Sequence, residues 1–218
     1  MDAPAAATAV FGDELPRAVA FAEFLATHGV ERGLLGPREV DRIWERHVLN
    51  SVAVGHAMPE GATVVDVGSG AGLPGMPVAL ARPDLQITLL EPLLRRSQFL
   101  EEAVEVLDLG ERVRVVRGRA VPPGDNDPLG HHERYDVVTS RAVAALPRLL
   151  GWCVPLMNAD GRIVALKGAT ATDEINQATQ DLRRHRLDAE ARSVVTHEGA
   201  EPTWLVVCTG SHAHPRTA

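Results

Sequence analysis

The spacing of hydrophobic positions changes near residue 62 and divides the chain into two parts. Before that point apolar residues recur at helical spacing, first from Leu15 to a terminal Gly29 and then over residues 39–54. The first ten residues lack this pattern and are typical of a frayed tail. We therefore expect an N-terminal helical extension over residues 1–60.

Beyond residue 62, short apolar runs alternate with amphipathic segments of helix length. Alternation of this kind predicts parallel strands with helices on both faces of an α/β sheet. The last two strands have no helix between them, which predicts a closing antiparallel hairpin. The expected strands cover residues 63–67, 85–90, 113–116, 135–139, 162–166, 192–196 and 204–208. We expect this seven-stranded, mostly parallel domain to span residues 61–210, followed by a flexible tail over 211–218.

Composition narrows the class of protein. The hydrophobic share of 45% and charged share of 23% are typical of a globular domain. No apolar run is long enough to span a bilayer, and the N-terminus lacks the features of a signal peptide. Two cysteines, Cys153 and Cys208, provide neither a disulfide framework nor metal-ligand spacing. We expect a cytoplasmic protein with no membrane association and no metal, and the net charge of −7 disfavours non-specific binding to polyanions.

A glycine-rich stretch, VVDVGSGAGLPGMPVAL, follows the first expected strand. Glycines at this position allow a backbone to approach a nucleotide closely. Gly70, Gly72 and Gly75 fit the dinucleotide pattern G-x-G-x-x-G, whereas a register beginning at Gly68 places Leu73 third. The stretch therefore predicts a cofactor at the carboxyl ends of the strands but leaves a nicotinamide and S-adenosylmethionine open.

Two carboxylates near this stretch favour S-adenosylmethionine. Glu91 ends the second expected strand, where it can accept hydrogen bonds from both ribose hydroxyls of any adenosine cofactor. Asp66 lies inside the first strand, where it would repel a pyrophosphate but attract an ammonium or sulfonium group. The alternative for Asp66, acceptance of backbone N–H groups to organise the loop, is compatible with either cofactor. Together with the closing hairpin, these features predict a Rossmann-like class I methyltransferase fold.

Several short motifs resemble those of one bacterial family. They are RHVLNS (46–51), DVGSGAGLPG (66–75), SRA (140–142), WC (152–153) and ALKG (165–168). With these motifs the chain resembles the RsmG (GidB) family. The resemblance implies an S-adenosylmethionine-dependent methyltransferase that modifies N7 of a guanine in 16S ribosomal RNA. It also implies 16S ribosomal RNA or a small-subunit assembly intermediate as partner, and no obligate protein partner. The alternatives are methylation of another substrate and an NAD(P)-binding oxidoreductase.

The expected site residues combine the motif with the resemblance. The cofactor-binding set is Asp66, Gly68, Gly70, Gly72, Leu73, Glu91, Ala120, Val121 and Arg141. The family usually carries an acid where this chain has Val121, so any side-chain contact at that position is lost. For the substrate we expect Arg141, the single lysine Lys167 and His47, although a satisfied half-buried histidine is the stronger interpretation of His47. No catalytic residue is assigned, because guanine N7 carries no proton and needs no general base.

Overall fold

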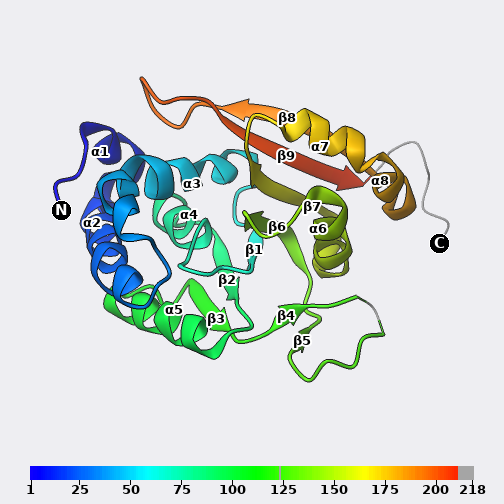
Figure 1. The fold of residues 1–218 in the computed structure, drawn as a ribbon, viewed down its shortest axis with the longest axis horizontal. Coiled ribbons are helices and arrows are strands. Elements are labelled where there is room, and N and C mark those ends of the chain that lie inside the picture. Colours follow the sequence, from blue (N-terminus) through cyan, green and yellow to red (C-terminus); the bar gives the residue numbers. More distant parts are fainter. Residues whose placement is uncertain (123, 211–218) are drawn as a thin grey trace.

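The computed structural model describes residues 1–122 and 124–210 and shows a seven-stranded sheet between two layers of helices (Figure 1). The strand order is β3-β2-β1-β6-β7-β9-β8. The strands are β1 (Thr63–Val67), β2 (Gln86–Leu90), β3 (Val113–Val116), β6 (Tyr135–Arg141), β7 (Met157–Lys167), β8 (Leu187–Val194) and β9 (Thr203–Gly210). From β1 to β3 successive strands are added on one side of β1, and from β6 onward they are added on the other side. Open α/β sheets bind ligands at this switch point in strand order.

Strand pairing confirms the expected fold. The pairs β1–β2, β1–β6, β2–β3 and β6–β7 are parallel, and β9 runs antiparallel to both β7 and β8. The expected bounds of β1 and β3 agree with the structure, whereas β7 begins five residues before the expected 162. The expectation for β8 at 192–196 was wrong, since the strand covers Leu187–Val194. This edge strand buries little apolar surface, so its sequence is mostly polar and lacks the apolar run by which the other strands were predicted.

Adjacent residues of the central strand point into different hydrophobic layers. Val64 belongs to the larger core, beneath the N-terminal helices, α4 (Gly75–Ala81) and α5 (Leu94–Val106). Val65 belongs to the smaller core, beneath α6 (Leu146–Cys153), α7 (Ala171–Gln177) and α8 (Thr179–His185). Both faces of the central strands are therefore covered, which accounts for their mainly apolar sequences.

The N-terminal segment shares the larger core with the sheet. It contains α1 (Ala5–Phe11), η1 (Gly12–Glu14), α2 (Leu15–Phe24), η2 (Leu25–Gly29), η3 (Pro37–Arg42), η4 (Ile43–Leu49), α3 (Asn50–Val52) and η5 (Ala53–Ala57). A frayed tail over the first ten residues was wrong, because Ala7 and Phe11 of α1 are buried in that core. Gly29 ends η2 but does not stop the chain's helical path, which continues through residues 30–31 before a turn at Gly33, whose φ is +68°.

The segment between β3 and β6 contains a small second sheet. Strands β4 (Arg119–Ala120) and β5 (Gly130–His131) pair in parallel and hold the segment at the lower edge of the molecule in Figure 1. This segment follows β3 and precedes β6, so it lies beside the carboxyl end of the sheet. The expected tail over 211–218 lies outside the described residues. None of the described helices is long and apolar enough to cross a membrane.

Candidate cofactor and substrate site

The glycine loop leaves β1 with a backbone that suits glycine. Gly70 has a φ of +57°, a conformation that side chains disfavour, although a Cβ there would meet nothing closer than 3.8 Å. Gly75 begins α4, and its hypothetical Cβ would lie only 2.4 Å from Cδ2 of Leu89. Gly75 therefore serves close packing between helix and strand, while Gly70 serves the turn itself.

Glu91 joins this loop to the end of β2. Its side chain is 2% exposed, and its Oε2 accepts the backbone N–H of Gly70 over 3.0 Å. The other oxygen, Oε1, accepts the N–H of Leu93 over 3.0 Å. Each carboxylate oxygen has a second lone pair, so ribose hydroxyls can still be accepted. The carboxylate thus holds both segments that border the expected ribose position.

Asp66 is fully buried beneath the same loop. Its Oδ2 accepts the N–H of Gly75 over 3.0 Å, which is the loop-organising contact expected as one alternative. Its Oδ1 has no hydrogen-bond partner among the described residues. Burial raises the pKa of this carboxyl to about 7, against the opposing effect of the Gly75 N–H. A buried acceptor without a partner fits a cationic ligand, as the methionyl ammonium and sulfonium of S-adenosylmethionine would provide.

A pocket of about 410 Å³ opens between the ends of β1 and β2, the β4–β5 segment and α6, and we call it the cofactor pocket. It is lined by Val67, Gly68, Leu90, Pro92, Gly118, Arg119, Ala120, Val121, Pro122, Asp125, Asp127, Val143, Arg148 and Trp152. Of the expected cofactor residues, Gly68, Ala120 and Val121 line it directly. The lining does not include the other six, which are Asp66, Gly70, Gly72, Leu73, Glu91 and Arg141. Leu73 packs against the larger core.

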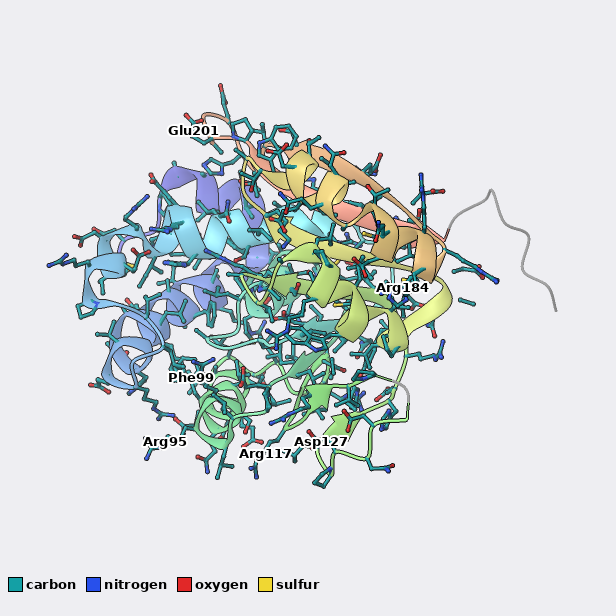
Figure 2. The ribbon with its side chains drawn as sticks, turned by 45° about the vertical axis from the view of Figure 1, so that its right-hand side comes forward. Arg95, Phe99, Arg117, Asp127, Arg184 and Glu201 are labelled. Carbon is teal, nitrogen blue, oxygen red and sulfur yellow. The ribbon has the colours of Figure 1, made fainter. Side chains whose placement is uncertain are left out.

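Sequence reasoning missed four polar or aromatic residues of the cofactor pocket. Arg148 and Trp152 stack, with the guanidinium carbon 4.7 Å from the ring centroid. Their spacing of four residues on one helix was a signal that could have been used. Asp125 and Asp127 come from the β4–β5 segment, and Figure 2 shows Asp127 beside that small sheet. The resemblance had placed Ala120 and Val121 of this segment at the cofactor, but nothing in the local sequence indicates that Asp125 and Asp127 also line the pocket.

Arg141 fastens the sheet to the N-terminal segment. Its Nη1 donates to the carbonyl oxygen of His47 over 3.3 Å and to Oγ of Ser51 over 2.9 Å. Its Nη2 donates to the carbonyl oxygen of Arg46 over 2.9 Å and lies 3.2 Å from Nδ1 of His47. Both terminal nitrogens of this guanidinium are therefore used inside the protein.

His47 is held between Arg141 and Glu39. Because a guanidinium only donates hydrogen bonds, Nδ1 of His47 accepts from Arg141 and the ring proton is on Nε2. That proton is donated to Oε2 of Glu39 over 2.9 Å. Burial lowers the pKa of His47, and the neighbouring Arg141 adds to this effect. Both ring nitrogens have partners, as the interpretation of a satisfied histidine expects, but the residue is 8% exposed and therefore buried, not half-buried.

A second, open groove of about 640 Å³ lies beside the cofactor pocket, and we call it the substrate groove. Arg46, Asn50, Arg141, Lys167 and Glu174 provide its polar side chains. Nζ of Lys167 donates to the carbonyl oxygen of Ala144 over 2.9 Å and to Oε2 of Glu174 over 2.7 Å. Val143 lines both the substrate groove and the cofactor pocket, so ligands in the two would be neighbours.

The chain has the fold of Rossmann-like methyltransferases of known structure. It is similar to the structure of the mitomycin 7-O-methyltransferase MmcR, with a TM-score of 0.56 and 19% identity over 95% of this chain and 69% of that one. It is also similar to a predicted O-methyltransferase, Atu636 from Agrobacterium tumefaciens, with a TM-score of 0.57 and 16% identity over 73% and 79% of the two chains. At such low identity these likenesses define the fold alone.

Relatives closer in sequence define the family. The family model GidB, rRNA small subunit methyltransferase G, matches residues 14–201. Proteins named ribosomal RNA small subunit methyltransferase G are 50% identical in Mycobacterium marinum, over 96% of this chain and 84% of the relative, and 52% identical in Corynebacterium jeikeium, over 93% and 90%. The chain belongs to the rRNA small subunit methyltransferase G (GidB) family. It is therefore a methyltransferase, and the oxidoreductase alternative is wrong.

Proposed function

We propose that the protein uses S-adenosylmethionine to methylate N7 of a guanine in 16S ribosomal RNA, in the cytoplasm. The observation that carries this proposal is the meeting of two cavities at Val143, one beside the glycine loop and one lined by cationic side chains. The names of the relatives support small-subunit ribosomal RNA as the substrate. The partner is either naked 16S ribosomal RNA or an assembly intermediate of the small subunit.

The chain's contribution to this reaction is binding and orientation. S-adenosylmethionine supplies an electrophilic methyl group, which passes from sulfur to the lone pair of guanine N7, leaving S-adenosylhomocysteine and a methylated, cationic base. N7 carries no proton, so no side chain has to remove one. Well-oriented reactants recover about 7–11 kcal/mol of a barrier. We assign the cofactor to Glu91, Asp66 and the glycine loop, and the base to the substrate groove beyond Val143.

Contacts with RNA would come from the cationic wall of the substrate groove. Lys167 has one ammonium proton beyond the two used on Ala144 and Glu174, and Arg46 lies on the same wall. Arg141 supports that wall through the N-terminal segment, and only its Nε is free of the contacts described above. Since the whole chain carries a net charge of −7, RNA binding would depend on this local surface and weaken with salt.

The direct test is mapping of N7-methylguanine in 16S ribosomal RNA after deletion of the gene. We expect one N7-methylguanine to disappear and to return when the wild-type gene is restored. A Glu91→Ala gene should fail to restore it. An unchanged modification profile in the deletion strain would contradict the proposed substrate and favour a methyltransferase that acts on another molecule.

The buried Asp66 predicts a pH dependence of cofactor affinity. Because its pKa is raised to about 7 in the folded protein, protonated Asp66 favours folding, and that contribution is lost as pH rises through about 7. The ionised form attracts the cationic cofactor. From pH 6 to pH 7 the ionised fraction rises from about one tenth to one half, so we expect roughly fivefold tighter binding of S-adenosylmethionine in calorimetric titrations.

Two comparisons make this expectation specific. Asp66→Asn cannot ionise, so its affinity for S-adenosylmethionine should be lower and independent of pH in this range. Adenosine carries no positive charge, so its binding to the wild-type protein should not strengthen between pH 6 and pH 7. A wild-type affinity for S-adenosylmethionine that stays constant over the range would show that Asp66 does not face the charged groups.

A further inference from the structure

The cofactor pocket contains two side-chain carboxylates besides its apolar walls. Val67, Leu90 and Pro92 line it from the ends of β1 and β2, while Val143 and Trp152 line it from the α6 side. A flat purine base fits between such walls. If Glu91 holds the ribose, the base is expected to occupy this pocket, since Leu90 and Pro92 on either side of Glu91 line it. Among the described lining residues, Asp125 and Asp127 carry the only side-chain groups that solely accept hydrogen bonds.

These two carboxylates differ in how they are already used. Asp127 pairs through Oδ2 with Nη1 of Arg119 over 3.1 Å, and its Oδ1 accepts the N–H of Leu129 over 2.9 Å. Asp127 therefore links Arg119 of β4 to Leu129, the residue before β5. Asp125 accepts the N–H of Asp127 through Oδ1 over 3.0 Å. Its Oδ2 makes no hydrogen bond or ion pair with another described residue, and Asp125 is exposed, so this oxygen is available to solvent and to a ligand.

We propose that Asp125 accepts a hydrogen bond from the exocyclic amine of the purine and makes the cofactor pocket selective for adenine over hypoxanthine. This inference rests on the proposed use of S-adenosylmethionine. An amine at the six position of the purine donates hydrogen bonds, whereas the oxo group of hypoxanthine at the same place only accepts them. Two acceptors facing each other repel, and a polar group left without a partner costs additional free energy. Asp127 acts indirectly, because it holds Asp125 in place.

The other ionised groups around the pocket are compatible with this assignment. Arg119 is paired with Asp127, and the Arg148 guanidinium stacks on Trp152. Neither arginine can accept a hydrogen bond from an amine. Val121 is 3% exposed and apolar, so it offers only contact area to the base. Of the two carboxylates in the lining, Asp127 already uses both oxygens within the β4–β5 segment, so we assign recognition of the amine to Asp125.

The test compares two ligands that differ at one substituent, S-adenosylhomocysteine and S-inosylhomocysteine, by calorimetric titration of the full-length protein. We expect the wild-type protein to prefer the adenosyl ligand by about tenfold or more. Asp125→Asn should reduce this preference to within about threefold, because an amide both donates and accepts hydrogen bonds. Asp125→Ala should weaken the adenosyl ligand while leaving the inosyl ligand nearly unchanged.

Control variants distinguish recognition of the amine by Asp125 from a general effect of charge and from a change in the conformation of the β4–β5 segment. Asp188→Asn removes an equivalent exposed charge on β8, at the far edge of the sheet, and should keep the wild-type preference. Asp127→Asn should weaken both ligands together and leave their ratio within about threefold of the wild-type ratio. A wild-type protein without preference, or Asp125 variants that keep it, would overturn the inference while leaving the proposed function intact. Failure of the wild-type protein to bind either ligand would overturn both.

Discussion

Replacing Glu91 with alanine is expected to lower the affinity for S-adenosylhomocysteine by about 100-fold, or about 3 kcal/mol. The carboxylate accepts the N–H groups of Gly70, in the glycine loop, and Leu93, just before α5. Its removal takes away the expected ribose contact and also releases the glycine loop from the end of β2. Calorimetric titration with S-adenosylhomocysteine measures the loss directly.

Two further variants show whether this loss is specific to the carboxylate. Glu91→Gln keeps a carbonyl oxygen that can accept one of the two N–H groups, so its affinity should fall between those of wild type and Glu91→Ala. Glu101→Ala removes an exposed carboxylate from α5 and should bind like the wild type. If Glu91→Ala retained its affinity and a normal melting temperature, the ribose position assigned here would be wrong.

Replacing Arg141 with alanine is expected to lower the free energy of unfolding by about 3 kcal/mol. The substitution removes the donor to the buried Oγ of Ser51 and the donor to the carbonyl oxygen of Arg46. It also removes one of two donors to the carbonyl oxygen of His47, which still accepts from the Ser51 hydroxyl. For a chain of this size the corresponding fall in melting temperature is roughly 6–12 °C. Differential scanning calorimetry at neutral pH is the measurement, because His47 is neutral there and accepts from Arg141.

The comparison with lysine separates charge from geometry at this position. Arg141→Lys keeps the charge but reaches fewer of the acceptors on the N-terminal segment, so it should recover only part of the stability. Arg134→Ala, an exposed arginine with one hydrogen bond to the carbonyl oxygen of Met157, should change stability by less than about 1 kcal/mol. A wild-type melting temperature for Arg141→Ala would show that this residue does not secure the N-terminal segment.

The fold was predictable because its signals are local. Each buried strand reads as an apolar run since both of its faces are covered, and each helix carries its own three-to-four-residue period. The predictions of individual elements failed where an element buries little apolar surface or is short. β8 lies at the sheet edge with polar residues, and α1 is too short for its period to stand out, although Phe11 is buried.

The candidate site was predictable only in part. Asp66, Gly68 and Glu91 were identified because cofactor loops of this kind follow the ends of adjacent parallel strands. The structure adds the partner of each carboxylate, and it gives Arg141 four internal contacts that its sequence position does not indicate. Their roles toward cofactor and RNA stay predictions until the variants described above are measured.

The sequence by itself determined the α/β class, the parallel core with its antiparallel hairpin, and the family to which the chain belongs. These depend on hydrophobic period and on short motifs, both of which are properties of neighbouring residues. Only the tertiary structure decided that Asp125 lines the cofactor pocket, that Arg141 is bound to the N-terminal segment, and that one oxygen of Asp66 has no partner. Those contacts join residues far apart in the chain, or depend on complete desolvation, and neither is encoded in local spacing.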